Sequence, residues 1–405
     1  MLEYFVIKLV DGCKINVFRT LSRLEARGYL CQMKKVGILG GGQLGRMLLQ
    51  AAANYPTETY VMENDAECPA ANLCHHFVLG NIRDFDSVLQ FGRTVDVLTI
   101  EIEQVNVDAL EQLEKEGITV IPRPAVLRTI QNKIHQKTFY QQNNIPTAPF
   151  RITPSRAALS EHLDLLPAVH KLGIGGYDGK GVTILNTVAD LDAGFDEPSV
   201  LEKKIEIQKE LAVLVAVSQT GEIVAYPSVE MVFDQKLNLL DYQICPSLIS
   251  TEIETKAVSL AKQLVSAFDS PGLFAVEMFI DLEDNIWINE IAPRVHNSGH
   301  HTIEAHYCSQ FDMLWRILMG MPLGNPEPIM PSLMLNLIGA NGFSGKARYE
   351  GLEELLRLPN AFLHLYGKKD TKPGRKMGHV TLMGSYLEDL TATADNIKST
   401  LRVIS

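Results

Sequence analysis

The chain has 405 residues, of which 46% are hydrophobic and 21% are charged, a composition typical of folded globular domains and not of a disordered chain. Its 37 basic and 48 acidic residues give a formal net charge of -11, the wrong sign for binding nucleic acid or an anionic membrane. We therefore expect small-molecule partners, with any phosphate bound at a local site.

The cysteine content and the hydropathy of the chain indicate the cellular compartment in which the protein is expected. The six cysteines form no Cys-x-x-Cys pair, so neither a disulfide framework nor a zinc site is expected. No apolar run approaches the roughly 20 residues that span a bilayer, and the N-terminus lacks the pattern of a secretory signal. These features predict a cytoplasmic protein.

The first convincing strand begins at Met33, where a glycine turn follows an apolar run. Residues 1–32 show weak alternation and scattered charge, a pattern compatible with a short hairpin and helix; we favour the interpretation that they are an N-terminal extension of doubtful significance. From residue 33 to about 130, strand and helix patterns alternate, which predicts a doubly wound parallel sheet.

A glycine motif ends the first strand. Gly40, Gly42 and Gly45 have the spacing of a dinucleotide fingerprint, and Glu63 lies 18 residues beyond the last glycine. This pattern favours a nicotinamide-dependent oxidoreductase only weakly, because the same turn serves any phosphate at a helix N-terminus.

A helix is predicted from about residue 125 to 143, ended by the proline-bounded segment 143–150. A second, mixed module follows over residues 131–325, and a small β-rich module is expected over 326–405. The predicted fold class is therefore α/β combined with α+β.

A second glycine loop lies between two strand patterns in the middle module. Residues 173–181 hold five glycines in nine positions, with Lys171 before them and Lys180 among them. Such a loop can close over a polyphosphate through its backbone N–H groups. It lacks the Gly-Lys-Ser/Thr signature of a P-loop.

Two carboxylates interrupt apolar strands further on. Glu277 and Glu290 would each cost several kcal/mol if buried without a partner, so each is expected to meet a cation. With Asn289 adjacent, they suit Mg²⁺ that bridges nucleotide phosphates. The alternative partner is an arginine such as Arg294.

The second carboxylate is followed by a dense polar run that indicates an anion site. It consists of Arg294, His296, Asn297, Ser298, His300 and His301. Histidine ligation of a metal, with His306 included, is the weaker interpretation, because the run contains no cysteine and has the Arg294 guanidinium beside its histidines.

Taken together, these motifs resemble the ATP-grasp superfamily, and within it the N5-carboxyaminoimidazole ribonucleotide synthetase family. The resemblance runs from Met33 to about Met383. It is carried by GGGQLGRM, EIEQV, IPTAPF, GGYDGKG, VEMF, NEIAPRVHNSGHHT, LNLIG and GRKMGH. It implies an ATP-grasp fold with an N-terminal parallel-sheet domain (33–130), an ATP-grasp domain (131–325) and a β-rich C-terminal domain (326–405).

The resemblance also implies the reaction and its residues. ATP and bicarbonate would form carboxyphosphate, which carboxylates 5-aminoimidazole ribonucleotide in purine biosynthesis; the enzyme would be a homodimer. Mg²⁺ would bind Glu277 and Glu290. The implied ATP-binding residues are Lys133, Lys171, Gly176, Tyr177, Asp178, Gly179, Lys180, Gly181, Glu202, Lys203, Lys204, Ile205, Glu210, Asn289 and Glu290. The implied catalytic residues are Asp178, Arg294, His296, Asn297, Lys368 and Glu103, and the implied substrate contacts are Gln43, Leu44, Glu103, Tyr177, Lys368 and Arg375.

Several positions depart from the family pattern near the nucleotide. Gly173 stands where the family has an arginine, in the run that includes Ile174, and Lys133 stands where arginine is commoner. Ile207 replaces a phenylalanine, and Met231 and Phe233 occupy places often held by asparagine and histidine. These changes affect nucleotide contacts and leave the carboxylate pair and the polar run intact.

Besides the oxidoreductase, two alternatives keep the fold. One is another ATP-grasp carboxylase or ligase with a different acceptor, which the GRKMGH motif and the short C-terminal module disfavour. The other is a weakly active paralogue that serves as a binding or scaffold subunit, which the departures at the nucleotide would favour.

Overall fold

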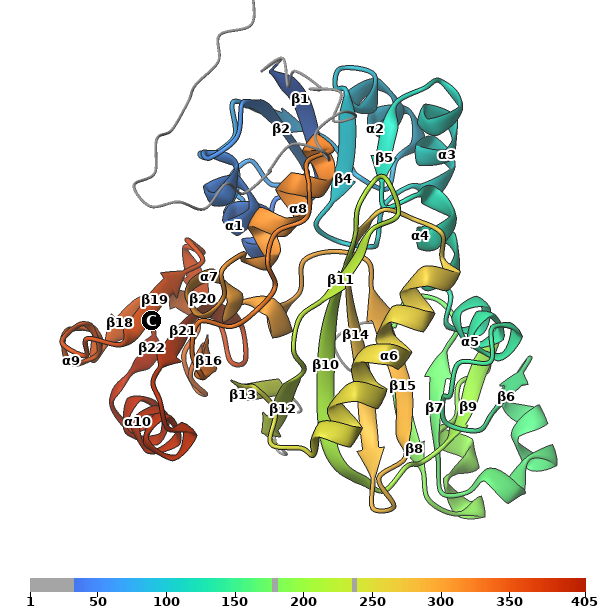
Figure 1. Ribbon diagram of the computed structural model, residues 1–405. Coiled ribbons are helices and arrows are strands. Elements are labelled where there is room, and N and C mark those ends of the chain that lie inside the picture. The colour runs from blue at the N-terminus through green and yellow to red at the C-terminus, as the bar shows by residue number, and fades with distance from the viewer. Residues whose placement is uncertain (1–32, 177–180, 235–238) are drawn as a thin grey trace, which may run out of the picture. The chain divides into compact units, whose positions relative to one another are not determined.

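The structure is a computed structural model that describes residues 33–176, 181–234 and 239–405 (Figure 1). The chain divides into two units, Met1–Met33 and Lys34–Ser405, and every helix and strand of the described residues belongs to the second unit. The expectation for residues 1–32 falls outside the described part of the chain.

A five-stranded parallel sheet opens the second unit, as the alternating pattern predicts. Its order is β3 (His76–Leu79), β2 (Thr57–Glu63), β1 (Lys34–Leu39), β4 (Val97–Ile100) and β5 (Thr119–Ile121). The helices α1 (Gln43–Ala52), α2 (Phe85–Gly92) and α3 (Val107–Lys115) connect these strands. Strand β3 is short and mostly exposed, which is why it has no clear apolar signal in the sequence.

The single helix predicted for residues 125–143 is wrong: the segment forms α4 (Pro124–Ile130) and α5 (Lys133–Gln142). Asn132 separates them, because its side chain accepts the N–H groups of Ile134 and His135 and so caps α5. Asparagine at this position stabilises a new helix start. The break sets the direction of α5, which begins at Lys133.

A four-stranded antiparallel sheet follows, in the order β6 (Phe150–Thr153), β9 (Ser199–Lys203), β7 (Ala168–Leu172) and β8 (Val182–Leu185). Three short 3-10 helices accompany it: Arg156–Glu161, Leu163–Leu165 and Val188–Ala193. The second glycine loop joins β7 to β8.

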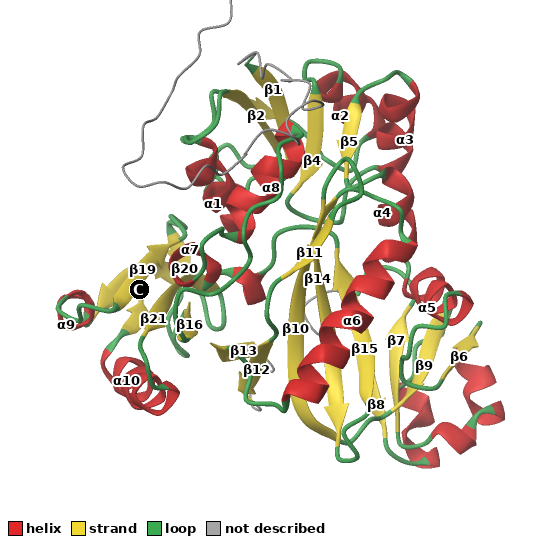
Figure 2. Cartoon of the chain, viewed as in Figure 1, coloured by secondary structure: helices red, strands yellow, loops and turns green. Residues whose placement is uncertain are grey.

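The largest sheet has β15 (Ile286–Ala292), β14 (Gly272–Asp281), β10 (Ile207–Val217), β12 (Val229–Asp234) and β13 (Leu239–Cys245) in that order. It continues through β16 (Ser332–Ile338), β21 (Lys376–Met383) and β19 (Ala361–Leu365), while β11 (Ile223–Ala225) pairs with β10. Helix α6 (Thr251–Ala267) lies across it (Figure 2) and packs Ala257, Ala261 and Leu264 against the buried faces of β10 and β14.

The large sheet therefore crosses the boundary predicted at residues 325 and 326, since β13 pairs with β16. The predicted division into domains stays a prediction. The last module also contains helices that the β-rich expectation omitted, α9 (Leu352–Leu356) and α10 (Leu387–Thr400). Its small strand pairs are β17 (Gly345–Lys346) with β20 (Asp370–Thr371), and β18 (Arg348–Glu350) with β22 (Arg402–Ile404).

After β15 come a 3-10 turn (Asn297–Gly299), α7 (Thr302–Ala305) and α8 (Gln310–Met319). Helix α8 packs on α1, where the fully buried Trp315 donates its indole N–H to the carbonyl of Leu48 at 2.6 Å. This contact joins the end of the middle module to the parallel-sheet module. Within the described residues, no helix is long and apolar enough to cross a membrane.

Candidate functional site

The two carboxylates singled out in the sequence face each other across a strand pair. Strands β14 and β15 are antiparallel, and Glu277 is the register partner of Glu290, with a bulge directly after it. Directly opposite residues of a strand pair point to the same face of a sheet. The fold therefore brings these carboxylates together, as predicted.

The pKa values of the two carboxylates are shifted in opposite directions. Burial, followed by the charges of Glu290 and Glu210, raises the pKa of Glu277 to about 8. Glu290 is partly desolvated by its neighbours although its side chain is 48% exposed, and the charges of Lys133 and Lys171 outweigh that desolvation and lower its pKa. Burial alone raises the pKa of Glu210 to about 7. Carboxylates crowded in this way fit a divalent cation, which would remove their repulsion.

Two predicted lysines lie beside the pair. Lys133 Nζ is 3.5 Å from Glu290 Oε2. Lys171 Nζ, on β7, is 3.1 Å from Glu202 Oε2 and 3.2 Å from Asn289 Oδ1. Five predicted nucleotide residues from four elements are thus gathered into one set of contacts.

A third lysine belongs to this group and was missed from the sequence. Lys137 Nζ is 3.2 Å from Glu202 Oε2, although the Lys137 side chain is only 2% exposed. Burial, opposed by Glu202, lowers the pKa of Lys137 to about 8. Lys137 also bonds Thr147 Oγ1, which donates to the carbonyl of Ile288 on β15. The available signal was its spacing of four residues from Lys133, which puts both on one helix face.

The glycine loop is described only at its two ends. Tyr177, Asp178, Gly179 and Lys180 lie outside the described residues. Gly181 has φ +74°, and a Cβ on it would lie 2.9 Å from the Cα of Gly176. Glycine is therefore required there by both backbone conformation and space.

The predicted adenine segment runs along the end of β9. Lys203 and Lys204 are exposed, and their backbone N–H groups bond the carbonyls of Pro149 and Pro167. Ile205, the second residue after β9, is half-buried.

On the other side of the carboxylates lies the polar run. His296 Nε2 is 3.5 Å from Glu277 Oε1, and Arg294 Nε is 2.9 Å from Glu103 Oε1. Burial, with Arg294 nearby, places the pKa of His296 well below its usual value. His296 is accordingly a neutral hydrogen-bonding group, and Arg294 carries the positive charge of the run. The amide nitrogen of Asn297 is buried and has no partner among the described residues.

Gln310, which sequence reasoning did not single out, holds this run in place. Its Oε1 accepts the backbone N–H of His296 and its Nε2 donates to the carbonyl of the same residue, both at 2.8 Å. Gln310 is fully buried at the start of α8. A polar residue is common at the start of an amphipathic helix, so the sequence gave no clear sign that Gln310 holds the polar run.

The first glycine turn is held by the protein's own carboxylates. Glu101 accepts the N–H groups of Gly42 and Gly45, each at 2.8 Å, and Glu63 accepts that of Gly41 at 3.0 Å. These are the groups that a dinucleotide would need. In the described structure, the N–H groups of Gln43 and Leu44 at the start of α1 make no hydrogen bond.

The third module approaches the same helix. A Cβ added to Gly367 would lie 3.3 Å from Arg46 Nη1 on α1, and Lys369 forms an ion pair with Glu67. Next to them, Lys368 Nζ donates to the carbonyl of Lys376 at 2.7 Å. Arg375 Nη1 donates to the carbonyl of Asp370, also at 2.7 Å.

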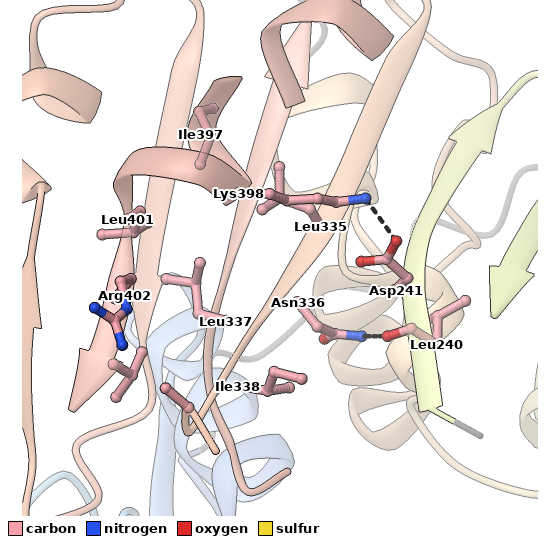
Figure 3. A pocket seen from close by; sticks show the side chains of 12 residues that line it. Leu240, Asp241, Leu335, Asn336, Leu337, Ile338, Ile397, Lys398, Leu401 and Arg402 are labelled. Atoms are coloured by element: carbon pink, nitrogen blue, oxygen red, sulfur yellow. Dashed lines mark hydrogen bonds and ion pairs between the residues drawn. The ribbon is translucent and has the colours of Figure 1, made fainter. Parts of the chain in front are cut away.

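None of the predicted site residues lines the pocket of about 330 Å³ between β16, β13 and α10 (Figure 3). Among its polar groups, Lys398 Nζ pairs with Asp241 Oδ2 at 2.6 Å, and Asn336 Nδ2 donates to the carbonyl of Leu240 at 2.8 Å. The pocket is therefore separate from the carboxylate site.

Comparison with known proteins agrees with this geometry. Three family models match: a ribonucleotide synthetase preATP-grasp domain over residues 33–131, an ATP-grasp domain over 138–311, and a phosphoribosylaminoimidazole carboxylase C-terminal domain over 332–393. The N5-carboxyaminoimidazole ribonucleotide synthase of Synechococcus elongatus is 35% identical over 86% of this chain and 89% of its own length. The chain belongs to the N5-carboxyaminoimidazole ribonucleotide synthase family.

Other relatives extend the comparison. The chloroplastic phosphoribosylaminoimidazole carboxylase of Vigna aconitifolia is 35% identical over 88% of this chain, which spans 65% of that longer protein. The crystal structure of the Thermotoga maritima synthetase superposes with a TM-score of 0.86 at 37% identity, covering 92% of this chain and all of that one.

A structure from Aspergillus clavatus, solved with ADP and 5-aminoimidazole ribonucleotide, has a TM-score of 0.81 at 35% identity, covering 91% of this chain and 100% of that one. The ATP-grasp fold, the ATP-dependent ligase activity and the role in purine biosynthesis that the sequence predicts are thereby confirmed. The oxidoreductase alternative is not supported.

Proposed function

We propose that the residues gathered around Glu277 and Glu290 carboxylate 5-aminoimidazole ribonucleotide with Mg-ATP and bicarbonate. One observation carries the proposal: the paired carboxylates separate two different environments. Glu290 faces Lys133 at 3.5 Å and Glu277 faces His296 at 3.5 Å. A nucleotide side and an anion side therefore meet at one strand pair.

On the nucleotide side, Lys133 and Lys171 would neutralise phosphate oxygens, with Glu210 on the ribose and residues 202–205 along the adenine. Glu277 and Glu290, with Asn289 beside them, are the oxygen donors suited to Mg²⁺, which would polarise the γ-phosphoryl group. The loop with Gly176, Tyr177, Gly179, Lys180 and Gly181 would cover the phosphates and exclude water.

On the anion side, an oxygen of bicarbonate would attack the γ-phosphorus, with ADP as the leaving group, to give carboxyphosphate. Arg294 would supply positive charge there, while neutral His296 and the unpartnered amide of Asn297 donate hydrogen bonds. The exocyclic amine then forms a bond to the carboxyl carbon, inorganic phosphate leaves, and the amine loses a proton.

The acceptor would lie between the parallel-sheet module and the third module. Its phosphate suits the unbonded N–H groups of Gln43 and Leu44 at the N-terminus of α1, together with Lys368 and Arg375. Asp178, Glu103 and Lys368 would orient the aminoimidazole or accept its proton. We further propose a homodimer and a cytoplasmic location.

The test is phosphate release from ATP, measured with bicarbonate in the presence and absence of 5-aminoimidazole ribonucleotide. We expect the ribonucleotide to stimulate release strongly, with bicarbonate required. Stimulation by another amine, such as glycinamide ribonucleotide, without a response to the aminoimidazole would overturn the acceptor.

A further inference from the structure

A buried group of two imidazoles and one thiol, which includes His301 at the end of the polar run, has no role in the reaction proposed above. Cys245 is the last residue of β13, and His301 and His306 flank the one-turn helix α7. One ligand atom from each of the three lies within 4.8 Å of the other two. Their exposed fractions are 1%, 2% and 4%.

These side chains hold polar atoms that nothing in the described structure satisfies. His301 Nε2 and His306 Nδ1 are buried without a hydrogen-bond partner. The other nitrogen of His306, Nε2, meets only the thiol, at 4.0 Å from Cys245 Sγ. An unpaired buried polar atom costs about 1–3 kcal/mol, so two imidazoles that each hold such an atom and are grouped with a thiol indicate a missing ligand.

The other ring nitrogen of His301 is oriented by neighbouring groups. Its Nδ1 is 2.9 Å from Gln243 Nε2, which also donates to the carbonyl of Ser298 at 2.6 Å. A histidine that binds a metal donates its other ring N–H to an acceptor. Binding at Nε2 would therefore require the Gln243 side chain to turn its Oε1, which has no partner among the described residues, toward Nδ1.

The donor set selects the kind of ion. A thiolate and two imidazoles suit zinc and related thiophilic ions, whereas Mg²⁺ prefers oxygen. Burial keeps the imidazoles neutral, which is the state that binds metal, and lowers the pKa of His306 to about 4. Burial also raises the pKa of the Cys245 thiol to about 12, so the thiol would lose its proton only on binding an ion.

We propose that Cys245, His301 and His306 form a zinc-binding site that ties the end of β13 to both ends of α7. Bonds of about 2.3 Å to sulfur and about 2.0 Å to nitrogen require the three donors to close by roughly 1 Å. A water molecule would complete the tetrahedron. The ion would stabilise the segment that follows residues 294–300. Its sulfur and nitrogen donors would differ from the oxygen donors at Glu277 and Glu290.

Sequence order concealed this group. The expectation that zinc is absent rested on the lack of a Cys-x-x-Cys pair and of a cysteine within the polar run, but β13 brings Cys245 to the histidines from 56 positions before His301. The reason for that expectation therefore does not hold in the folded chain.

Cobalt titration of the full, chelator-treated chain tests the proposal, with excess Mg²⁺ present to occupy the carboxylate site. We expect a thiolate-to-cobalt charge-transfer absorption that saturates at one ion per chain and is displaced by Zn²⁺. Cys245→Ser should abolish the band, and Cys74→Ser, at a half-buried cysteine elsewhere, should leave it unchanged. A band that survives in Cys245→Ser, or no band in the wild-type chain, would overturn the site.

His306→Gln provides a second variant that keeps the thiol and the core volume. We expect it to weaken zinc binding at least about tenfold in a competition titration against a chromophoric chelator. Zinc should raise the melting temperature of the wild-type chain and not that of His306→Gln. Equal zinc affinity in the two folded proteins would contradict the proposal.

Discussion

Glu277 and Glu290 differ in charge state although they are register partners on one strand pair. Glu277 faces neutral His296 and two other carboxylates, while Glu290 faces lysines. The environment and not the residue type therefore sets which carboxylate holds a proton in the free protein. Binding of a cation would be expected to displace that proton.

Replacing Glu290 with glutamine removes one of the two charged oxygen donors proposed for Mg²⁺. We expect turnover to fall by at least about a hundredfold, because electrostatic stabilisation by a metal is worth several kcal/mol. Steady-state phosphate release measures the effect. Glu283→Gln, at the exposed turn of the same hairpin, is the matched control, and wild-type turnover in Glu290→Gln would refute the metal role.

Gln310 bonds both the N–H and the carbonyl of His296 from a fully buried position. Gln310→Leu should destabilise the fold by about 1–3 kcal/mol, because it leaves these two backbone groups unpaired. It should also lower kcat more than it raises the KM for ATP. Urea denaturation and initial rates measure the two effects, with Gln263→Leu on the exposed side of α6 as control; an unchanged kcat would show that the bonds serve stability alone.

At the scale of elements, one carboxylate occupies the N–H groups of the first glycine turn that a dinucleotide would need. Glu101 follows β4 and binds the N–H groups of Gly42 and Gly45 at the start of α1. A carboxylate there also suits the positive end of the helix dipole. In the described structure, the N–H groups of Gln43 and Leu44, which lie between these two glycines, are left for a substrate phosphate.

Replacing Glu101 with glutamine would exchange one of its two accepting oxygens for an NH₂ donor, which leaves the N–H of either Gly42 or Gly45 without an acceptor. We expect a loss of about 1–3 kcal/mol in the free energy of unfolding. Equilibrium denaturation compares it with Glu114→Gln, at an exposed position of α3. Equal stability of the two variants would mean that Glu101 does not hold the turn.

The four-stranded sheet contains a buried histidine that makes stability depend on pH. His170 Nδ1 accepts the N–H of Phe195, and Nε2 lies 3.0 Å from Thr153 Oγ1. Burial lowers the pKa of His170 to about 4, below the value of the unfolded chain. The unfolded chain then binds more protons between pH 6.5 and 4, so this contribution is complete above pH 6.5 and is lost as pH falls.

His170→Leu should therefore flatten the dependence of stability on pH below 6.5 by up to about 1.4 kcal/mol per pH unit. Its stability at neutral pH should also be lower, because Phe195 and Thr153 lose their partner. Denaturation midpoints over this pH range give the slopes. A slope equal to that of the wild type would show that His170 titrates normally in the folded chain.

At the scale of the whole molecule, the proposed site draws on the parallel-sheet module, the middle module and the third module. Arg294 pairs with Glu103, and Gly367 lies against Arg46. The large sheet crosses from β13 to β16 without interruption. This continuity gives the third module a fixed position relative to the carboxylates.

Arg375→Ala should raise the KM for the ribonucleotide roughly tenfold or more with little change in kcat, because a charged hydrogen bond to phosphate is worth about 1.5–3 kcal/mol. Initial rates at varied ribonucleotide concentration measure this. Arg348→Ala, exposed on β18 of the same module, should behave as the wild type. An unchanged KM for the ribonucleotide in Arg375→Ala would show that Arg375 does not contact the substrate.

The sequence alone determined the features that depend on residues close together in the chain. The alternating pattern indicated the parallel sheet, two carboxylates in apolar strands predicted their own pairing, and the NEIAPRVHNSGHH run identified the family. These succeed because strand periodicity and the cost of a buried charge act at the residue itself.

Tertiary structure decided which distant side chains share a partner. Glu101 fills the glycine turn, Lys137 joins Lys171 on Glu202, and Cys245 meets His301 and His306. Each depends on strands or helices that pack across long sequence separations, where a side chain's environment follows from the whole fold. The local pattern of these residues was compatible with ordinary burial, so only the packed chain could assign them their contacts.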